Sequence, residues 1–329
     1  MYKLSIILPI YGVEKYLPTC LDSIYSQATD ECQIILVDDQ SPDRCPEICE
    51  EYKARYPEHT LVIHQENKGL GGARNTGMAA AAGEYIFFVD SDDYLPKGTI
   101  PHLLSSIERF GAEVFVFPFY LVDEDGNRLG SYKDEFPVNI PFSVKDDKAV
   151  LTGIPSAWNK VCKADLYRRL EITFPSRVWY EDIRTTPKLL SKAESVVFLD
   201  REMYNYLQRE GSIMSSAKVE KNIEIIEALE DLIGWFKKEG TYEEFREEID
   251  YLVIDHVLVS ATVRVLRSAN AKHPLVKQLR SFTKENCLSF KTGKNGYVKY
   301  RMPTSRKLIY NLLRKKMYWA VSLIFKIKK

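Results

Sequence analysis

The first 120 residues alternate short, almost continuously apolar runs with longer polar segments. Apolar runs without a polar side are typical of parallel strands in a sheet that is covered on both faces. The segments between them have the length and polarity of helices. This order is a series of βαβ units, which predicts an open, mostly parallel, Rossmann-like α/β sheet with helices on both faces. The expected strands are 4–8, 33–37, 61–64, 85–89 and 113–117, and the expected helices are 14–28, 42–56, 70–82 and 97–109.

The chain changes character after this alternating part. An Asp-Gly-Asn turn at residues 125–127 predicts a hairpin, and sequence rich in proline and aromatic residues continues to about residue 215. Residues 218–269 follow a helical pattern with few glycines or prolines. We therefore expect one α/β domain and a helical C-terminal region. The domain spans 1–215, with halves at 1–117 and 118–215, and the helical region spans 216–329.

Charge is distributed unevenly along the chain. The 329 residues carry 46 Lys and Arg against 46 Asp and Glu, a formal net charge of zero. Residues 1–100 have a net charge of −8, residues 101–270 of −7 and residues 271–329 of +15. An acidic body with a strongly basic end is suited to an anionic surface, either a membrane or a polymer. We do not expect nucleic acid as a partner, because no recognised binding motif accompanies the basic charge.

The basic end predicts an amphipathic helix over residues 303–329. Nine Lys or Arg occur from residue 301 onward with no acid, together with apolar residues such as Leu308, Trp319 and Leu323. This composition suits the surface of an anionic bilayer. The alternative is that the helix packs its apolar face on residues 218–269 or on another copy of the chain, which would make a homo-oligomer.

The amino terminus and the cysteines indicate a cytoplasmic protein, with peripheral contact to the inner face of the cell membrane through the basic end. Residues 4–9 are too short an apolar run for a signal peptide, and no stretch reaches the ~18–20 apolar residues of a spanning helix. The six cysteines lack the spacing of a metal site and are expected to be reduced structural thiols.

Polar side chains follow four of the expected strands, at the edge where parallel sheets bind ligands. The sharpest group is Asp-Ser-Asp-Asp at residues 90–93, directly after a buried strand. Carboxylates this close repel one another and are suited to Mg²⁺ or Mn²⁺, which would bridge them to phosphate oxygens. The alternative is a solvated acidic turn in which Asp93 caps the next helix. We favour the metal-binding interpretation.

The other strand ends are consistent with a nucleotide site. Asp38 and Asp39 either serve as turn and N-cap groups before the helix at 42–56 or accept hydrogen bonds from a base or a ribose. Gly-Leu-Gly-Gly at residues 69–72 lacks the spacing of known phosphate loops, so its glycines can equally shape a turn. Arg74 is more informative, since a guanidinium suits a diphosphate.

These segments together resemble the signature of glycosyltransferase family 2 on a GT-A fold, in its bacterial capsule and wall-polymer branch. The resemblance covers about residues 3–215. Two residues, Gly12 and Gln40, depart from the family pattern near the expected base pocket, which leaves the choice of UDP, GDP, TDP or CDP open. The segments that carry the resemblance are 5–12, 36–43, 67–75, 90–93, 158–161, 180–182 and 208–213.

The resemblance implies an inverting, metal-dependent transfer of a hexose or N-acetylhexosamine. The donor would be a nucleotide sugar, most commonly UDP-linked, and the acceptor a hydroxyl of a surface polysaccharide, a wall polymer or a lipid-linked chain. Asp182 would be the catalytic base, with Glu181 as the second candidate. Asp92 would bind the Mn²⁺ or Mg²⁺, and Asp90 would contact the ribose, the donor sugar or the metal.

The resemblance also assigns the remaining contacts. The nucleotide sugar would meet Pro9, Tyr11, Asp38, Asp39, Asn67, Arg74, Asp90 and Ser91. The acceptor, or a segment that closes over the diphosphate, would involve Trp158, Lys160, Trp179, Arg209 and Ser212. The alternatives are that the aromatic residues belong to the core and that Arg209 and Ser212 lie in an ordinary surface turn. Two other functions stay open: a nucleotide-sugar-binding scaffold that has lost catalysis, and a nucleotidyltransferase, which shares a similar core and acidic metal residues.

Overall fold

The computed structural model describes residues 2–209, 219–269 and 271–327, which form two compact units. The first unit contains residues up to 147 and residues 156–210, and the second contains residues 148–155 and the chain from 211 onward. The expected boundary at residue 215 lies outside the described residues. Residues 148–155, which we expected in the first domain, belong to the second unit.

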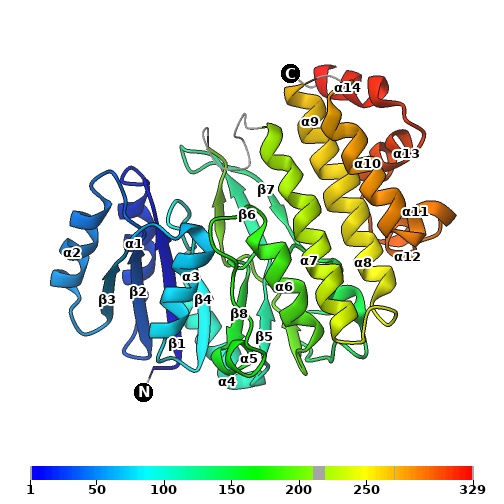
Figure 1. The fold of residues 1–329 in the computed structure, drawn as a ribbon. Coiled ribbons are helices and arrows are strands. Elements are labelled where there is room, and N and C mark those ends of the chain that lie inside the picture. The colour runs from blue at the N-terminus through cyan, green and yellow to red at the C-terminus, as the bar shows by residue number, and fades with distance from the viewer. Residues whose placement is uncertain (1, 210–218, 270, 328–329) are drawn as a thin grey trace. The chain divides into compact units, whose positions relative to one another are not determined.

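A seven-stranded sheet forms the centre of the first unit (Figure 1). The strand order is β3-β2-β1-β4-β8-β5-β9, and β8 runs antiparallel to both neighbours while the other pairs are parallel. The predicted mostly parallel α/β sheet is confirmed. The strands are β1 Leu4–Ile10, β2 Cys32–Asp38, β3 Thr60–His64, β4 Tyr85–Phe88, β5 Val114–Val116, β8 Lys160–Lys163 and β9 Val196–Phe198.

Helices cover both faces of this sheet, so every residue of β1 and β2 is buried. The β1–α1–β2 and β2–α2–β3 connections step in one direction and β3–α3–β4 steps back, which places α3 on the face opposite α1 and α2. Figure 1 shows α3 in front of the sheet. The helices of this unit are α1 Leu17–Tyr25, α2 Cys45–Arg55, α3 Gly69–Ala80, α4 Thr99–Phe110, α5 Ala164–Arg169 and α6 Glu181–Ser191.

The glycines of the 69–77 segment serve close packing. Gly69 has φ +73° at the first position of α3, a backbone conformation that side chains with a Cβ rarely adopt. A Cβ on Gly71 would clash with the carbonyl oxygen of Pro175, and one on Gly77 would clash with Ile7 of β1. The glycine-rich run therefore packs the start of α3 against the segment at 174–177, and Gly77 seats the helix on β1.

A second, three-stranded sheet has the order β10-β6-β7. Strands β6 and β7 form an antiparallel hairpin closed by the turn at Asp123–Asn127, as the Asp-Gly-Asn sequence predicts. Strand β10 pairs in parallel with β6 on the other side. The strands are β6 Phe119–Val122, β7 Arg128–Tyr132 and β10 Asn205–Leu207.

The second unit is helical, as expected. Its central helical run covers residues 246–268 and contains a nine-residue π-helical segment, Val253–Ala261, with Ile254, Val257 and Leu258 in the core. Its α-helices are α7 Glu224–Lys238, α8 Arg246–Leu252, α9 Thr262–Ser268, α10 Pro274–Asn286, α11 Leu288–Thr292, α12 Gly296–Tyr300, α13 Thr304–Arg314 and α14 Tyr318–Ile327, and 3-10 turns span Lys148–Thr152 and Val219–Ile223.

The prediction of one helix over 303–329 is wrong, because the chain turns at Lys316, whose φ is +60°, and forms α13 and α14 instead. Helix α13 is fixed to the π-helical segment by an ion pair between Arg306 Nη2 and Asp255 Oδ1 at 2.7 Å, and α14 packs on α9. This arrangement agrees with the alternative that we gave for the basic end, in which its apolar face packs on residues 218–269. Trp319, at 66% exposed, stays on the surface.

Two sequence expectations concern the compartment. All six cysteines are buried, free thiols. Across the described ranges, every helix is too short or too polar to cross a bilayer.

Candidate active site

The acidic run after β4 divides into accessible and buried carboxylates. The side chains of Asp90 and Asp92 are 22% and 26% exposed. Asp93 is buried; its Oδ1 accepts a hydrogen bond from the Leu207 N–H at 2.7 Å and its Oδ2 accepts one from the Tyr204 hydroxyl at 2.9 Å. Asp93 therefore fixes β10 beneath the site and does not cap the following helix. Burial raises the pKa of this carboxyl well above its ordinary value.

Tyr204 holds the run in place, a role that the sequence reasoning missed. Its hydroxyl accepts a hydrogen bond from the Asp90 N–H at 3.0 Å while it donates to Asp93. Its ring stacks on Trp158, with 4.5 Å between the ring centroids. Both aromatic residues are buried, so the expected acceptor contact Trp158 lies in the core beneath the site. A buried tyrosine needs a polar partner, but Tyr204 lies 114 residues from Asp90 in the chain, so the sequence carries no signal that pairs them.

Arg74 is the centre of the site. This side chain is 1% exposed, and its guanidinium contacts three carboxylates. Nη2 donates to Asp90 Oδ1 at 3.0 Å, and Nη1 donates to Glu181 Oε1 at 2.8 Å and to Asp182 Oδ1 at 2.6 Å. The pairing joins the end of β4 to the first turn of α6. The groups predicted to bind the metal and to act as base are therefore brought together by one buried cation.

This arrangement changes the role expected of Arg74. We expected it to lie along a diphosphate, whereas both Nη atoms are engaged by carboxylates. The close packing of α3 turns the side chain inward, where its guanidinium lies 5.3 Å from the Phe174 ring centroid and 5.8 Å from that of Phe88. Arg74 thus holds Asp90, Glu181 and Asp182 together from a buried position.

The site retains excess negative charge, because three carboxylates share Arg74. Burial, together with the neighbouring Asp182, raises the pKa of Glu181 to about 7 against the lowering effect of Arg74. Burial likewise raises the pKa of Asp90 to about 6, against the lowering effect of Arg74. A site of this kind favours binding a cation or accepting a proton near neutral pH.

The two candidate bases differ in access. The side chain of Asp182 is 21% exposed and that of Glu181 is 11% exposed. Asp182 Oδ2 also accepts a hydrogen bond from the Ala157 N–H at 3.2 Å. The residue before the pair, Tyr180, has φ +63°, which is unusual for an aromatic residue and costs free energy. The strained backbone at Tyr180 sets the direction in which the side chains of Glu181 and Asp182 project from α6.

Asp92 pairs with Arg209 at the other side of the acidic run. Arg209 Nε donates to Asp92 Oδ2 at 2.8 Å, Nη2 forms an ion pair with the same oxygen at 2.7 Å, and the guanidinium lies over the Tyr16 ring. The structure thus places Arg209 next to Asp92, the expected metal ligand. We had expected Arg209 near the diphosphate. Ser212, from the same predicted segment, lies outside the described residues.

The donor atoms fit a divalent cation that is shared with a substrate. In residues 2–209, 219–269 and 271–327, no three acidic, histidine or cysteine side chains form a metal site of protein groups alone. Asp90 Oδ2 and Asp92 Oδ1 take part in none of the hydrogen bonds described above. Two carboxylates are a usual protein contribution to Mg²⁺ or Mn²⁺ when phosphate oxygens and water supply the remaining ligands.

The predicted base-binding acids have structural partners. Asp39 is buried and accepts hydrogen bonds from the N–H groups of Lys68 and Gly69, both at 2.8 Å. Asp39 thereby stabilises the start of α3. The capping alternative had assigned it to the start of a different helix, the one expected at 42–56. Asp38 Oδ2 lies 2.9 Å from His64 Nδ1. The hydrogen bond raises the pKa of this histidine.

Further predicted contacts surround the same strand ends. Asn67 Nδ2 donates to the Asp39 carbonyl oxygen. The Ser91 hydroxyl donates to the Pro9 carbonyl oxygen at 2.7 Å, which ties the acidic run to the end of β1. Tyr11, by contrast, is 54% exposed just beyond β1, where its ring is free to meet a ligand.

The remaining acceptor candidates have different environments. Lys160, at the start of β8, is buried, and its Nζ donates to the Ser156 carbonyl oxygen at 3.0 Å. Burial lowers its pKa to about 8. Trp179 is half-buried, and its ring meets that of Tyr180 edge to face. Trp179 is therefore the more accessible of these two side chains.

Comparison with known protein families gives one assignment and several relatives. Residues 5–170 match the model of the family described as "Glycosyl transferase family 2". "Glycosyltransferase GlyA" of Streptococcus pneumoniae is 34% identical over 222 residues, 64% of this chain and 31% of that protein. "Poly(ribitol-phosphate) beta-glucosyltransferase" of Bacillus spizizenii is 31% identical over 240 residues, 71% of this chain and 37% of that protein. The chain thus spans about a third of the length of these two relatives.

The fold has a counterpart among solved structures. S. aureus TarS 1–349 in complex with UDP-GlcNAc matches with a TM-score of 0.59 and 24% identity, over 89% of this chain and 92% of that one. At this identity the likeness shows the fold. It confirms the predicted GT-A-type α/β architecture followed by a helical C-terminal region.

Proposed function

Because the chain belongs to glycosyl transferase family 2, we propose that it transfers a hexose or N-acetylhexosamine from a nucleotide sugar, UDP-linked, to a hydroxyl of a wall polymer, a surface polysaccharide or a lipid-linked chain. The observation that carries this proposal is the Arg74 cluster, which places Asp90 and Asp182 on one guanidinium. The named activity of the Bacillus spizizenii relative supports a sugar donor and a polymer acceptor.

The proposed reaction is an inverting single displacement. Asp182 accepts the proton of the acceptor hydroxyl as the oxygen attacks the anomeric carbon, and the nucleoside diphosphate leaves from the opposite side. The greater exposure of Asp182 over Glu181 favours it as the base. Arg74 holds Asp182 in position through the 2.6 Å ion pair.

Asp92 and Asp90 would hold a Mn²⁺ or Mg²⁺ ion through their uncommitted oxygens. When bound, this ion supplies positive charge to the leaving diphosphate. Arg209 adds a second positive group at the same place, because its guanidinium already lies 2.7 Å from Asp92 Oδ2. A guanidinium at this distance suits the oxygens of a diphosphate.

The second unit supports a peripheral location at an anionic membrane, which is part of the proposal. Leu308, Trp319 and Leu323 are exposed on α13 and α14, in the stretch that carries nine Lys and Arg from residue 301 onward. Exposed aromatic and aliphatic side chains among cations suit a bilayer surface. Other side chains of both helices pack on protein, so such contact would involve their outer faces alone.

We expect Asp92→Asn to remove metal-dependent donor hydrolysis. The substitution keeps the side-chain shape but replaces the carboxylate that the proposal assigns to the cation, so turnover should fall at least about a hundredfold. The measurement is release of UDP from a panel of UDP-sugars with Mn²⁺ and with EDTA. Asp125→Asn, an equivalent change at an exposed hairpin turn, should leave the rate within about twofold.

The same assay separates the alternative functions. UDP binding without hydrolysis of any donor, in the wild-type protein with Mn²⁺, would indicate the catalytically inactive scaffold. Release of pyrophosphate from UTP and a sugar 1-phosphate, with no hydrolysis of any UDP-sugar, would indicate a nucleotidyltransferase. Undiminished hydrolysis by Asp92→Asn, or by the wild-type protein in EDTA, would contradict the metal assignment.

A further inference from the structure

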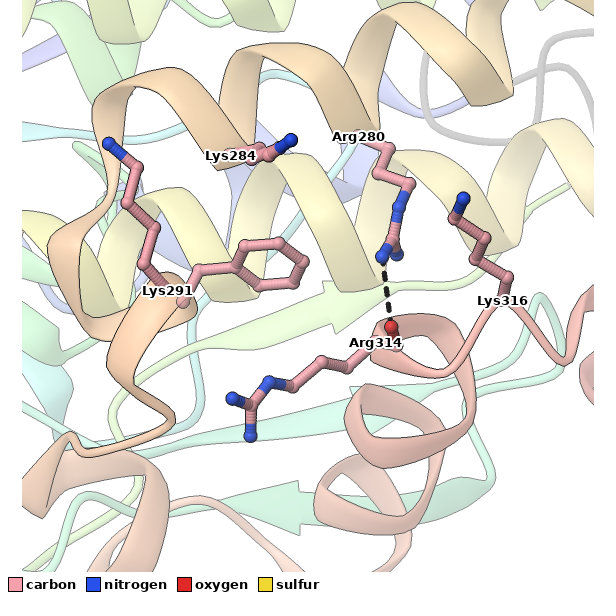
Figure 2. Close-up of a pocket in the computed structure, with 6 residues that line it drawn as sticks. Arg280, Lys284, Lys291, Arg314 and Lys316 are labelled. Carbon is pink, nitrogen blue, oxygen red and sulfur yellow. Dashed lines mark hydrogen bonds between the residues drawn. The ribbon is translucent and has the colours of Figure 1, made fainter.

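A basic pocket of about 410 Å³ lies within the second unit. It is lined by five cationic side chains around one aromatic ring, contributed by α10, α11, α13 and the turn before α14 (Figure 2). None of its lining residues belongs to the site described above. The lining residues, which we call the basic pocket, are Arg280, Lys284, Phe290, Lys291, Arg314 and Lys316.

The position of the pocket is fixed by the fold. Arg280 Nη1 donates to the Leu313 carbonyl oxygen at 2.7 Å and Nη2 donates to that of Arg314 at 2.9 Å, so α10 holds the end of α13 (Figure 2). The Arg280 guanidinium also lies 5.3 Å from the centre of the Phe290 ring. Arg314 lies against Gly293, where a Cβ would collide with its guanidinium. These contacts fix the Arg280 guanidinium at the Phe290 ring and the Arg314 guanidinium at Gly293.

The charge of the basic pocket is unbalanced. In the described part of the chain, Lys284, Lys291, Arg314 and Lys316 form no ion pair, and the bonds of Arg280 go to neutral carbonyl groups. None of the lining residues is acidic, and residues 271–329 contain a single acid, Glu285. Like charges gathered in one recess repel one another, and a bound anion would relieve this repulsion.

We propose that the basic pocket binds phosphodiester groups of an anionic polymer, and that this polymer is the acceptor. The identification of the polymer as acceptor rests on the proposed function. Guanidinium and ammonium groups together suit phosphate oxygens. The volume is in the range of sites for organic ligands, so the recess has room for a phosphate with its carbon substituents, which the Phe290 ring can contact. Five cations also exceed the charge of one diester, which favours a chain of them.

A polymer fits these observations better than a membrane does. The cations line a recess around Phe290, whereas the exposed apolar side chains suited to a bilayer, such as Trp319 and Leu323, do not line it. A polyanion that contacts the pocket would hold the acceptor on the enzyme through successive transfers. Its binding would weaken with salt, since each contact displaces counterions.

The test measures binding of purified poly(ribitol phosphate) to the full-length chain by calorimetry at low salt. Lys284→Gln combined with Lys316→Asn removes two pocket cations and keeps the structural Arg280. We expect its affinity to fall about tenfold or more. Lys277→Gln combined with Lys299→Gln removes the same charge at exposed positions outside the pocket. This control should bind within about twofold of the wild-type protein.

Three results would overturn the proposal. The first is an unchanged affinity of the pocket variant for the polymer, and the second is an equal loss of affinity in both variants. The third is a pocket variant that loses binding to vesicles containing phosphatidylglycerol but keeps its affinity for the polymer, which would assign the pocket to a lipid headgroup. Donor hydrolysis is measured on the same proteins and should be unchanged in both variants. Pocket-dependent polymer binding by a wild-type protein without donor hydrolysis would contradict the proposed function and still support the pocket.

Discussion

Replacing Arg74 with methionine is expected to lower the free energy of unfolding by about 3–5 kcal/mol, because it leaves buried carboxylates without their cation. Asp90, Glu181 and Asp182 all contact this guanidinium, which is 1% exposed. Transfer activity should be lost together with stability, since the first turn of α6 would no longer be tied to the end of β4. Urea denaturation followed by circular dichroism measures the change.

The effect of Arg74→Met should depend on pH. The pKa of Glu181 is raised to about 7, above the value of about 4.3 for an unfolded chain. The folded state therefore binds this proton more tightly, and the contribution of the group to stability is lost as pH rises through about 7. Arg74 lowers the pKa of Glu181, so its removal raises that pKa further. The variant should be more destabilised at about pH 8 than at about pH 5.

Two controls accompany this variant. Arg74→Lys retains a positive charge but not the planar fork that reaches three carboxylates, so its loss of stability should be intermediate. Arg44→Met removes an arginine that is 72% exposed and lies 4.0 Å from Glu51, and should change stability by less than about 0.5 kcal/mol. Stability of Arg74→Met equal to that of Arg44→Met would refute the assignment of Arg74 as the central cation.

Asp182→Asn is expected to lower the rate of sugar transfer by a factor of about 10²–10⁴ while donor binding is retained. The amide has nearly the same shape and can still accept a hydrogen bond from Arg74, but it cannot take a proton from the acceptor hydroxyl. Transfer is measured with a radiolabelled UDP-sugar and a polymer acceptor, and UDP affinity is measured separately by calorimetry.

The neighbouring acid and a matched position provide the comparison. Glu181→Gln should reduce transfer less than Asp182→Asn, because Glu181 is the less exposed member of the pair. Asp165 is the second residue of α5, as Asp182 is of α6, and Asp165→Asn should leave transfer within about twofold. A larger loss in Glu181→Gln would assign the base to Glu181.

Strong local patterns explain which parts of the fold could be predicted. Strands β1 and β2 are apolar throughout because both faces are covered, and this signal lies within each segment. Strand β8 was missed because Lys160–Lys163 has four residues, two of them lysines, and it enters the sheet between β4 and β5 from a distant part of the chain. The break at Lys316 was missed because the apolar pattern continues across it.

The candidate site likewise has parts that local sequence patterns predicted and parts that they did not. The acidic run after β4 and the Glu181–Asp182 pair were found as motifs, and the structure brings them together. Their connection through Arg74 depends on the close packing of α3 at Gly71 and Gly77, which no local pattern contains. The hydrogen bonds of Asp39 likewise depend on where α3 begins. Partners across the sheet follow from strand order, and a single sequence does not specify that order.

The most direct test of the central claim is NMR of a reaction that contains the wild-type protein, a UDP-sugar, Mn²⁺ and a polymer acceptor. The phosphorus spectrum identifies the leaving group, and the proton spectrum gives the configuration at the anomeric carbon of the product. We expect UDP and a new glycosidic bond of inverted configuration to appear in equal amounts. Release of UMP and a sugar 1-phosphate in place of UDP, or a glycosidic bond of retained configuration, would contradict a single displacement with Asp182 as base.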